Sequence, residues 1–584
     1  MIPVRSYFRL LVEYLRPLRS RVMLLALTLL VSIALQLVNP QLVKVFIDRA
    51  TEGESRQTLI PLAVWFIVIA VIHQVFTVVS TYLAEDLGWA ATNEMRARLT
   101  DHVLHLDMGF HKEHTPGELI ERIDGDVTSL SNFFSAFTIR VIGNIMLLVG
   151  ILTLLWLENV WVGLGLTAFA VVTLAIMLRL QMVAVPWWKQ VRATSATLFG
   201  FVGEQLGGTE DIRANGGDAY MVHRFTAILR DWLPEQVRGR MGFAVLWGTG
   251  IGSYVIGTAL VFWLGSILLG NGALTLGSVY LVFYYTGMTR QPMDQIRSQM
   301  EDFQKAGAGI ARVEELFART PALASDGVVH LATGALAVTF DNVEFAYDDA
   351  AGDERVLHGV SFELAPGRVL GVLGRSGSGK TTLARLLTRL YDPQRGAVLL
   401  GGIDAAQVAT EELRRRVGMV TQDVQLFRAS VRDNLTFFDG DRVTDERLRD
   451  VLHRLGLDDW LAALADGLDS QLESGGGGLS AGQAQLLAFT RIFLRDPGVV
   501  ILDEASSRVD PVTEAMIERA VDRLLEGRTG IIIAHRLATV NRADDILIME
   551  DGRVVELGER VRLAADPDSR LSTLLATGIE EVLA

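Results

Sequence analysis

The chain has 584 residues, half of them apolar, which exceeds what one hydrophobic core supports, so we expect at least two domains. Its formal net charge of −14 argues against nucleic acid as a partner, because nucleic-acid surfaces need clustered Lys and Arg. The absence of cysteine excludes disulfides, thiolate metal sites and a cysteine nucleophile.

Six apolar stretches in the first half of the chain are long enough to cross a bilayer. A hydrocarbon core of about 30 Å takes roughly 20 helical residues. We therefore predict an all-α six-helix transmembrane domain over residues 1–320. The predicted spans are 22–46, 59–83, 134–157, 160–180, 243–269 and 276–293.

The connections between these spans predict the topology. They are short after the first, third and fifth spans, and long and charged after the second and fourth. The arginines ahead of the first span place the N-terminus and both long connections in the cytoplasm, as expected for a multi-pass protein of the inner (plasma) membrane. The pattern over residues 5–16 further predicts an amphipathic helix lying on the membrane lipids, with a frayed cytoplasmic tail as the alternative. The arginines are Arg5, Arg9, Arg16, Arg19 and Arg21.

Both long connections, 85–131 and 182–242, have helical patterning, so we expect the spans to continue as helices beyond the membrane. Each connection contains a glycine-bearing segment at which the chain can turn back, 113–119 in the first and 204–214 in the second. A plain solvated loop is the alternative for each segment.

A Pro/Ser/Gly-containing linker over residues 321–335 predicts a domain boundary. Beyond it, apolar runs such as 369–374 and 498–503 alternate with amphipathic helical patterns. This alternation indicates an α/β domain with a largely parallel sheet over residues 336–584.

The motif "GRSGSGKTT" follows the first of these strands and fits a phosphate-binding loop. Its glycines let backbone N–H groups turn toward phosphate oxygens at a helix N-terminus, and its lysine neutralises the β- and γ-phosphates. A threonine hydroxyl can ligate Mg²⁺. The sequence therefore predicts that ATP and Mg²⁺ bind here, to Gly374, Ser376, Gly377, Gly379, Lys380, Thr381 and Thr382.

A second apolar strand ends in two adjacent carboxylates, Asp503 and Glu504. In α/β folds, ligands bind at the carboxyl edge of the sheet. We expect Asp503 to hold Mg²⁺ and Glu504 to polarise the water that attacks the γ-phosphate. By itself, an apolar strand that ends in Asp-Glu could be an ordinary strand terminus. The phosphate loop in the same domain is what makes the pattern specific.

Between these motifs, the sequence "LSAGQ" (Leu479, Ser480, Ala481, Gly482 and Gln483) resembles the LSGGQ signature of ABC transporters. The resemblance extends over nearly the whole chain and implies an α/β P-loop ATPase domain of ABC type behind an exporter-type membrane domain. In that family the signature of one subunit covers the ATP held by its partner. A Ser hydroxyl and Gly amides at a helix start can bind an anion, so the resemblance gives Ser480, Gly482 and Gln483 a place at the nucleotide.

The same resemblance assigns further residues. Gln422 resembles the Q-loop glutamine, with a place near the catalytic centre and its Mg²⁺, and His535 resembles the switch histidine. Tyr347 resembles the aromatic residue that stacks on adenine. Asp510 resembles a polar end of the D-loop. The catalytic set implied is Glu504, His535 and Gln422.

Three departures from the family pattern bear on the partner. Ala481 replaces the first signature glycine, Ala484 stands where Arg or Lys is usual, and Arg508 replaces a D-loop alanine. These departures resemble subunits of heterodimeric exporters with one weak ATP site, so we expect a second half-transporter as partner. A homodimer is the alternative.

The mechanism implied by the family is alternating access, which exports a small hydrophobic or amphipathic substrate such as a drug, lipid or peptide. Uptake, a homodimeric lipid or drug flippase, and a regulatory subunit with a dispensable ATPase are the alternatives. Polar residues in or near the spans either line the substrate cavity or bond neighbouring helices. They are Gln36, Asn39, His73, Gln74, Arg140 and Asn144.

Overall fold

The structure is a computed structural model that describes residues 13–577 with internal gaps, and the chain forms two compact units. The first contains Met1–Leu104 and Gly117–Arg319, and the second contains His105–Pro116 and Thr320–Ala584. The predicted surface helix over 5–16 lies mostly outside the described residues. The internal gaps are 137–140, 322, 324–326, 328, 348–354, 422–423, 441–442, 474, 476–478, 504–510 and 535–539.

The described part of the first unit is helical, as the apolar stretches predict. Its long helices carry many exposed large apolar side chains, including Val64, Ile67 and Val71 on one helix, which is what a lipid-facing surface requires. The short element η1 (Arg16–Leu18) precedes the long helices. Further short elements lie between them: α5 (Pro116–Ile120), η2 (Glu121–Asp126), α6 (Val127–Ala136) and α9 (Thr209–Ala214). The long helices are α2 (Arg19–Thr51), α3 (Arg56–Leu104), α7 (Asn144–Glu158), α8 (Val160–Gly207), α10 (Asp218–Gly270) and α11 (Leu276–Ala318).

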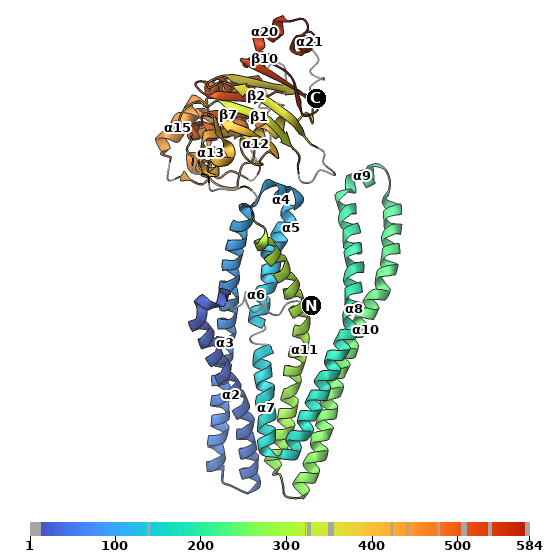
Figure 1. The fold of residues 1–584 in the computed structure, drawn as a ribbon. Coiled ribbons are helices and arrows are strands. Elements are labelled where there is room, and N and C mark those ends of the chain that lie inside the picture. The colour runs from blue at the N-terminus through green and yellow to red at the C-terminus, as the bar shows by residue number, and fades with distance from the viewer. Residues whose placement is uncertain are drawn as a thin grey trace. The chain divides into compact units, whose positions relative to one another are not determined.

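Helices α3, α8 and α10 continue far past their apolar parts, with 49, 48 and 53 residues. The second connection turns back at α9, within the predicted segment 204–214. The first turns back at α4 (Met108–Glu113), which precedes the predicted segment 113–119 and shares only Glu113 with it. Figure 1 shows α8 and α10 running side by side, joined through α9. Asn159 begins α8 as its N-cap, accepting hydrogen bonds from the backbone N–H groups of Trp161 and Val162.

All six predicted spans overlap helices of the structure, but only five described helices are apolar enough over a sufficient length to cross a membrane. Helix α11 contains the predicted sixth span and is not among the five. The reason lies in its composition, because tyrosines, threonines and an arginine interrupt its apolar residues between Leu276 and Met293. This segment is nevertheless packed, since Leu281 and Tyr285 are fully buried.

The second unit is built on two sheets, and its six-stranded sheet is mainly parallel, as predicted. The strand order is β10-β9-β3-β8-β7-β6, in which only β10 is antiparallel to its neighbour. A smaller antiparallel sheet of order β2-β1-β4-β5 was not predicted. The strands are β1 (Val338–Phe345), β2 (Leu357–Leu364), β3 (Val369–Gly374), β4 (Arg395–Leu400), β5 (Ile403–Asp404), β6 (Val417–Val420), β7 (Val499–Asp503), β8 (Thr529–Ile533), β9 (Asp545–Glu550) and β10 (Arg553–Glu559).

Helices alternate with these strands and bury the central strands β3, β7 and β8 completely. Parallel strands buried on both faces require continuous apolar runs, which explains why their sequences lack alternation. The helices are α12 (Lys380–Leu387), η4 (Ala405–Gln407), α13 (Thr410–Arg416), α14 (Val431–Thr436), α15 (Asp445–Arg454), α16 (Asp458–Ala463), η6 (Gly467–Asp469), α17 (Ala481–Arg495), α18 (Pro511–Leu525), α20 (Arg560–Ala565) and α21 (Arg570–Thr577).

Candidate functional site

The phosphate-loop motif joins the end of β3 to the first residue of α12, as the sequence predicts. Gly377 and Gly379 have φ angles of 81° and 101°, in the left-handed region that favours glycine. The loop therefore needs glycine at these two positions to reach the helix N-terminus, where backbone N–H groups and the helix dipole favour an anion.

Two buried polar side chains in this loop fit a phosphate ligand. Lys380 is 5% exposed, and its ammonium donates to the carbonyl oxygens of Gly374 and Arg375, at 2.7 and 2.9 Å. The Ser378 hydroxyl is buried and has no hydrogen-bond partner among the described residues. A buried hydroxyl without a partner is costly, and a phosphate oxygen would satisfy it. Ser378 was not among the predicted ligands, although its place in the motif offered a signal.

Tyr347 lies beside the first turn of α12. Its hydroxyl accepts a hydrogen bond from Arg385 at 3.0 Å and lies 3.1 Å from the Thr382 hydroxyl. The ammonium of Lys112, on α4, lies 4.7 Å from the centre of the Tyr347 ring. Sequence reasoning missed Lys112 and Arg385, because neither belongs to a nucleotide-binding motif.

Asp503 ends β7 and is 6% exposed. Strands β3, β8, β7 and β6 are parallel, so their carboxyl ends meet at one edge of the sheet, which brings the phosphate loop and Asp503 to the same edge. The hydroxyl of Thr381 and the carboxylate of Asp503 are oxygen donors of the kind Mg²⁺ prefers. Within the described ranges, no group of three or more His, Cys, Asp or Glu side chains could hold a metal ion.

Four of the predicted site residues lie outside the described residues, so their predicted roles are untested. They are Gln422, Glu504, Asp510 and His535. In the sequence, three of them come directly or almost directly after the described ends of β6, β7 and β8.

The signature segment forms the start of α17. Ser480 is the N-cap: its hydroxyl accepts from the Gln483 backbone N–H, and the Gln483 side chain accepts from the Ser480 N–H. This reciprocal capping box fixes the helix start. Gly482 is buried, whereas Ala481 is exposed, so its additional methyl group points away from the packed interior. Ala484 packs against the core, at the position where the family usually has a cation.

In the first unit, polar side chains within the apolar helices bond neighbouring helices. The Ser32 and Thr77 hydroxyls, on α2 and α3, are 3.0 Å apart, and His73 Nε2 lies 3.4 Å from the Thr77 hydroxyl. Asn39 differs, because its buried side-chain oxygen has no partner within the described parts of the chain. Arg140 lies outside the described residues.

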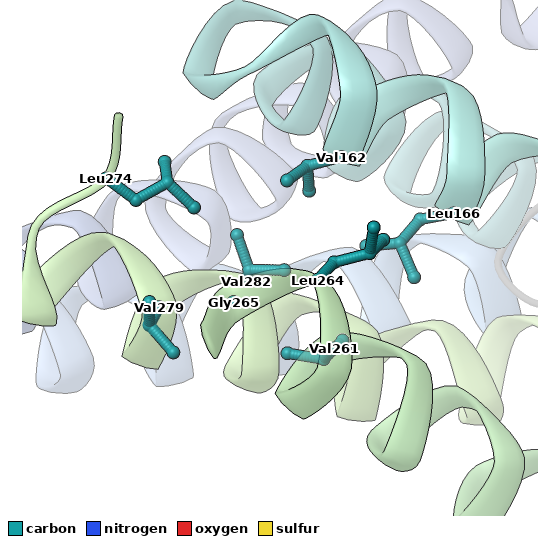
Figure 2. Close-up of a pocket in the computed structure, with 8 residues that line it drawn as sticks. All are labelled: Val162, Leu166, Val261, Leu264, Gly265, Leu274, Val279 and Val282. Carbon is teal, nitrogen blue, oxygen red and sulfur yellow. The ribbon is translucent and has the colours of Figure 1, made fainter. Parts of the chain in front are cut away.

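A small apolar cavity lies among α8, α10 and α11 (Figure 2). Its volume is about 10 Å³, far below the several hundred Å³ of a drug-sized site. It is therefore a packing defect rather than a substrate site. Its lining residues are Val162, Leu166, Val261, Leu264, Gly265, Leu274, Val279 and Val282.

Comparisons with known proteins agree with this two-part organisation. The family described as "ABC transporter transmembrane region" matches residues 22–293, and the family described as "ABC transporter" matches residues 357–507. The uncharacterized ABC transporter ATP-binding protein YknV of Bacillus subtilis is 30% identical over 95% of this chain and 92% of its own length.

Two further similarities concern function and fold. An ATP-dependent lipid A-core flippase of Pseudomonas fluorescens is 29% identical over 99% of this chain and 97% of its own length. The solved structure of a bacterial Atm1-family ABC exporter with ATP bound matches with a TM-score of 0.77 and 26% identity. That match covers 96% of this chain and 98% of the solved one.

Proposed function

This chain belongs to the ABC transporter family, and from that premise we propose that it is half of a dimeric exporter of hydrophobic or amphipathic compounds. It is an ATPase whose hydrolysis is coupled to transport across a membrane, and it binds ATP. The observation that supports the proposal most is the phosphate loop of Lys380 and Ser378 in one chain with five helices of membrane length among its described residues.

We assign the nucleotide contacts as follows. The triphosphate lies on the N-terminus of α12, where Lys380 and the loop N–H groups neutralise it, and the adenine stacks on Tyr347. Thr381, Asp503 and Gln422 hold Mg²⁺, which supplies charge neutralisation at the β- and γ-phosphates. The remaining loop contacts come from Gly374, Ser376, Gly377, Gly379 and Thr382.

Glu504 polarises the water that attacks the γ-phosphate, and His535 and Gln422 complete the catalytic set. In this arrangement Ser480, Gly482, Gln483 and Asp510 face the nucleotide of the partner subunit. Hydrolysis then requires two subunits, because one chain supplies the phosphate loop and the other supplies the signature.

Transport follows from differential binding. ATP holds the two ATPase domains together, so it favours the closed dimer over the open one, and the long connections pass this change to the spans. We place the N-terminus, both long connections and the ATPase domain in the cytoplasm. We divide the chain into a membrane domain (1–320), a linker (321–335) and an ATPase domain (336–584).

The partner is either a different half-transporter or a second copy of this chain. We favour a different partner with one weak ATP site on the resemblance alone, because Ala484 stands where the family usually has a cation and Arg508 replaces a D-loop alanine. Purifying the chain alone and with a co-expressed half-transporter, and measuring the ATPase rate of each, separates the two dimers.

The export proposal is tested with reconstituted liposomes containing a fluorescently labelled phospholipid. We expect ATP-dependent movement of the probe between leaflets, and its loss in Lys380→Ala, which removes the phosphate-binding ammonium. ATP hydrolysis without movement of this probe or of an amphipathic dye would contradict the substrate class. Probe movement that persists in Lys380→Ala would contradict the ATP coupling.

A further inference from the structure

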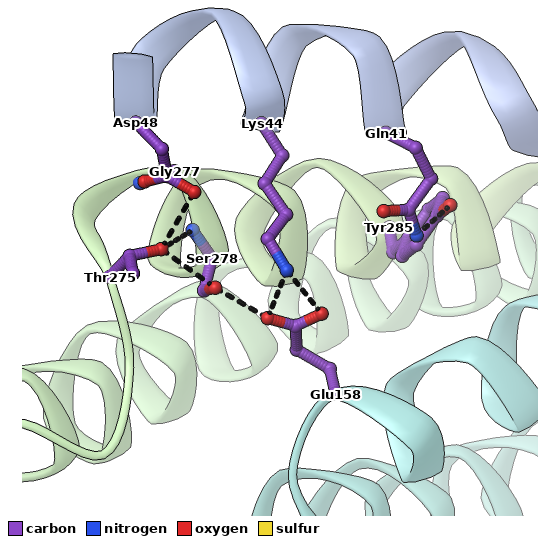
Figure 3. A network of polar contacts seen from close by, with 8 residues as sticks. All are labelled: Gln41, Lys44, Asp48, Glu158, Thr275, Gly277, Ser278 and Tyr285. Atoms are coloured by element: carbon purple, nitrogen blue, oxygen red, sulfur yellow. Dashed lines mark hydrogen bonds and ion pairs between the residues drawn. The ribbon is translucent and has the colours of Figure 1, made fainter.

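A network of polar side chains joins three helices at one end of the membrane unit (Figure 3). It contains residues from the C-terminal part of α2, the last residue of α7 and the first turns of α11. This end is opposite to the one at which α11 leads into the ATPase unit. Its members are Gln41, Lys44, Asp48, Glu158, Thr275, Gly277, Ser278 and Tyr285.

The centre of the network is an ion pair between α2 and α7. The Lys44 ammonium donates to both carboxylate oxygens of Glu158, at 2.6 and 2.7 Å. The two side chains are 22% and 13% exposed, so water screens the pair only in part. The Ser278 hydroxyl, on α11, also donates to Glu158, so one carboxylate connects three helices.

A second carboxylate of α2 caps the start of α11. Asp48 accepts from the Gly277 backbone N–H at 2.8 Å and from the Thr275 hydroxyl at 2.9 Å. A carboxylate at a helix N-terminus is favourable because it pairs orphan N–H groups and opposes the helix dipole. The two helices approach closely here, since a Cβ at Gly277 would lie 2.4 Å from the Lys44 carbonyl oxygen.

Deeper in the unit, the contacts become mainly apolar. Gln41 donates to the Tyr285 hydroxyl at 3.1 Å, and that hydroxyl donates to the Leu37 carbonyl oxygen at 2.7 Å. Behind these bonds lies an apolar cluster in which Ile151 and Leu281 are fully buried. The polar network therefore covers the apolar interior at this end.

We propose that this network is the outer latch of the transporter, which holds α2 against α7 and α11 until ATP closes the ATPase domains. The inference rests on the proposed alternating access, in which this end faces the outside. Opening would move α2 away from α7 and α11. Ion pairs and helix caps suit a contact that must open, because water can bind each polar group when the helices separate. Exposing apolar surface to water would instead be unfavourable.

The test uses the cysteine-free chain, so an introduced cysteine is the only thiol. Leu281→Cys reports from behind the latch, and Ile151→Cys is an independent reporter on another helix. Each is labelled with a membrane-impermeant maleimide from the outer side of proteoliposomes, with and without ATP, in a Glu504→Gln background. We expect slow labelling without ATP and faster labelling with ATP.

The latch is then weakened by Glu158→Gln. Without ATP we expect labelling to become about tenfold faster, because losing one charge-assisted hydrogen bond changes the opening equilibrium by about that factor. Gly277→Ala should act in the same direction by forcing α2 and α11 apart. The charge exchange Lys44→Glu with Glu158→Lys should restore slow labelling, which a merely structural role of either residue would not do.

The matched control is Glu54→Gln, which removes an exposed outer carboxylate whose nearest contact to Arg49 is 3.9 Å. We expect it to label like the parent chain. If Glu158→Gln labels like Glu54→Gln at both reporters while ATP still accelerates labelling, the latch is wrong. If ATP changes labelling in no variant, the proposed alternating access fails instead.

Discussion

At the scale of single residues, Tyr347 combines two separable contributions. Its hydroxyl is held by Arg385 and Thr382 on α12, while its ring faces the ammonium of Lys112 on α4. The hydroxyl contacts position the ring beside the phosphate loop. As proposed, the ring supplies the stacking surface for adenine.

Substitutions at Tyr347 should separate these contributions. Base stacking on an aromatic ring contributes about 1–3 kcal/mol, so we expect Tyr347→Ala to raise the KM for ATP about tenfold or more. Tyr347→Phe keeps the ring and should raise KM only slightly. The check is the ATPase rate as a function of ATP concentration. Equal KM values for the two variants would contradict stacking on this ring.

Arg491 is a buried cation in the ATPase unit that the motif analysis did not single out. Its guanidinium donates to the carbonyl oxygens of Asn434 and Gln425, at 2.8 and 3.0 Å, and stacks on Phe437. Burial, with a smaller contribution from nearby Arg495, lowers the pKa of Arg491 to about 10. It therefore remains charged at neutral pH and connects α17 to α14 and the preceding loop.

We expect Arg491→Met to destabilise the ATPase unit by about 2 kcal/mol, because the buried Asn434 carbonyl and the partly buried Gln425 carbonyl lose their donor. Arg449→Met, on the exposed face of α15, is the control and should leave the melting temperature unchanged. The pKa of Arg491 is lower in the folded chain than its ordinary value, so the folded chain releases this proton first and the titration raises stability with pH only above about pH 10. The deficit should thus be the same at pH 6 and pH 8, and a deficit that changes over this range would refute the assignment.

At the scale of elements, α17 has a start that serves the fold and, as proposed, the nucleotide of the partner. The capping box of Ser480 and Gln483 fixes the start of the helix. The Ser480 hydroxyl and the first backbone N–H groups of α17 lie at this N-terminal end. Stability and ATP hydrolysis therefore make different demands on Ser480.

Ser480→Asp distinguishes the two demands. Aspartate is as good an N-cap as serine, so thermal stability should change by less than about 0.5 kcal/mol. Its negative charge would oppose the γ-phosphate, so ATPase activity should fall at least tenfold. Ser480→Ala should lower stability by about 1 kcal/mol through loss of the cap. Full activity of a stably folded Ser480→Asp protein would place the signature away from the nucleotide.

Element by element, the sequence predicts the transporter's helices better than their ends. Continuous apolar runs reveal five described helices of membrane length, because lipid contact demands apolar side chains, and the strands β3, β7 and β8, because both of their faces are buried. The sixth span is less apolar than its packing suggests, since Tyr285 is buried through hydrogen bonds to α2. The periodicity of the sequence does not predict the capping box of α17 or the cap of α11 by Asp48, because both depend on the directions in which side chains point.

At the scale of the whole molecule, sequence predicts motifs but not contacts between distant segments. Lys112 contacts Tyr347, although the two residues lie far apart in the sequence. Lys44 contacts Glu158 on a different helix of the membrane unit. Neither residue of the second pair belongs to a motif. The structure places α4, from the first long connection, in the same compact unit as the ATPase domain.

The central claim is that this chain hydrolyses ATP through Glu504 within a dimer. The most direct test is the steady-state ATPase rate of the purified chain in lipid, alone and with a co-purified half-transporter, each with and without Glu504→Gln. We predict activity in at least one dimer that Glu504→Gln abolishes while ATP still binds, because the substitution removes only the water-polarising carboxylate. Activity that survives Glu504→Gln in both settings would contradict the account.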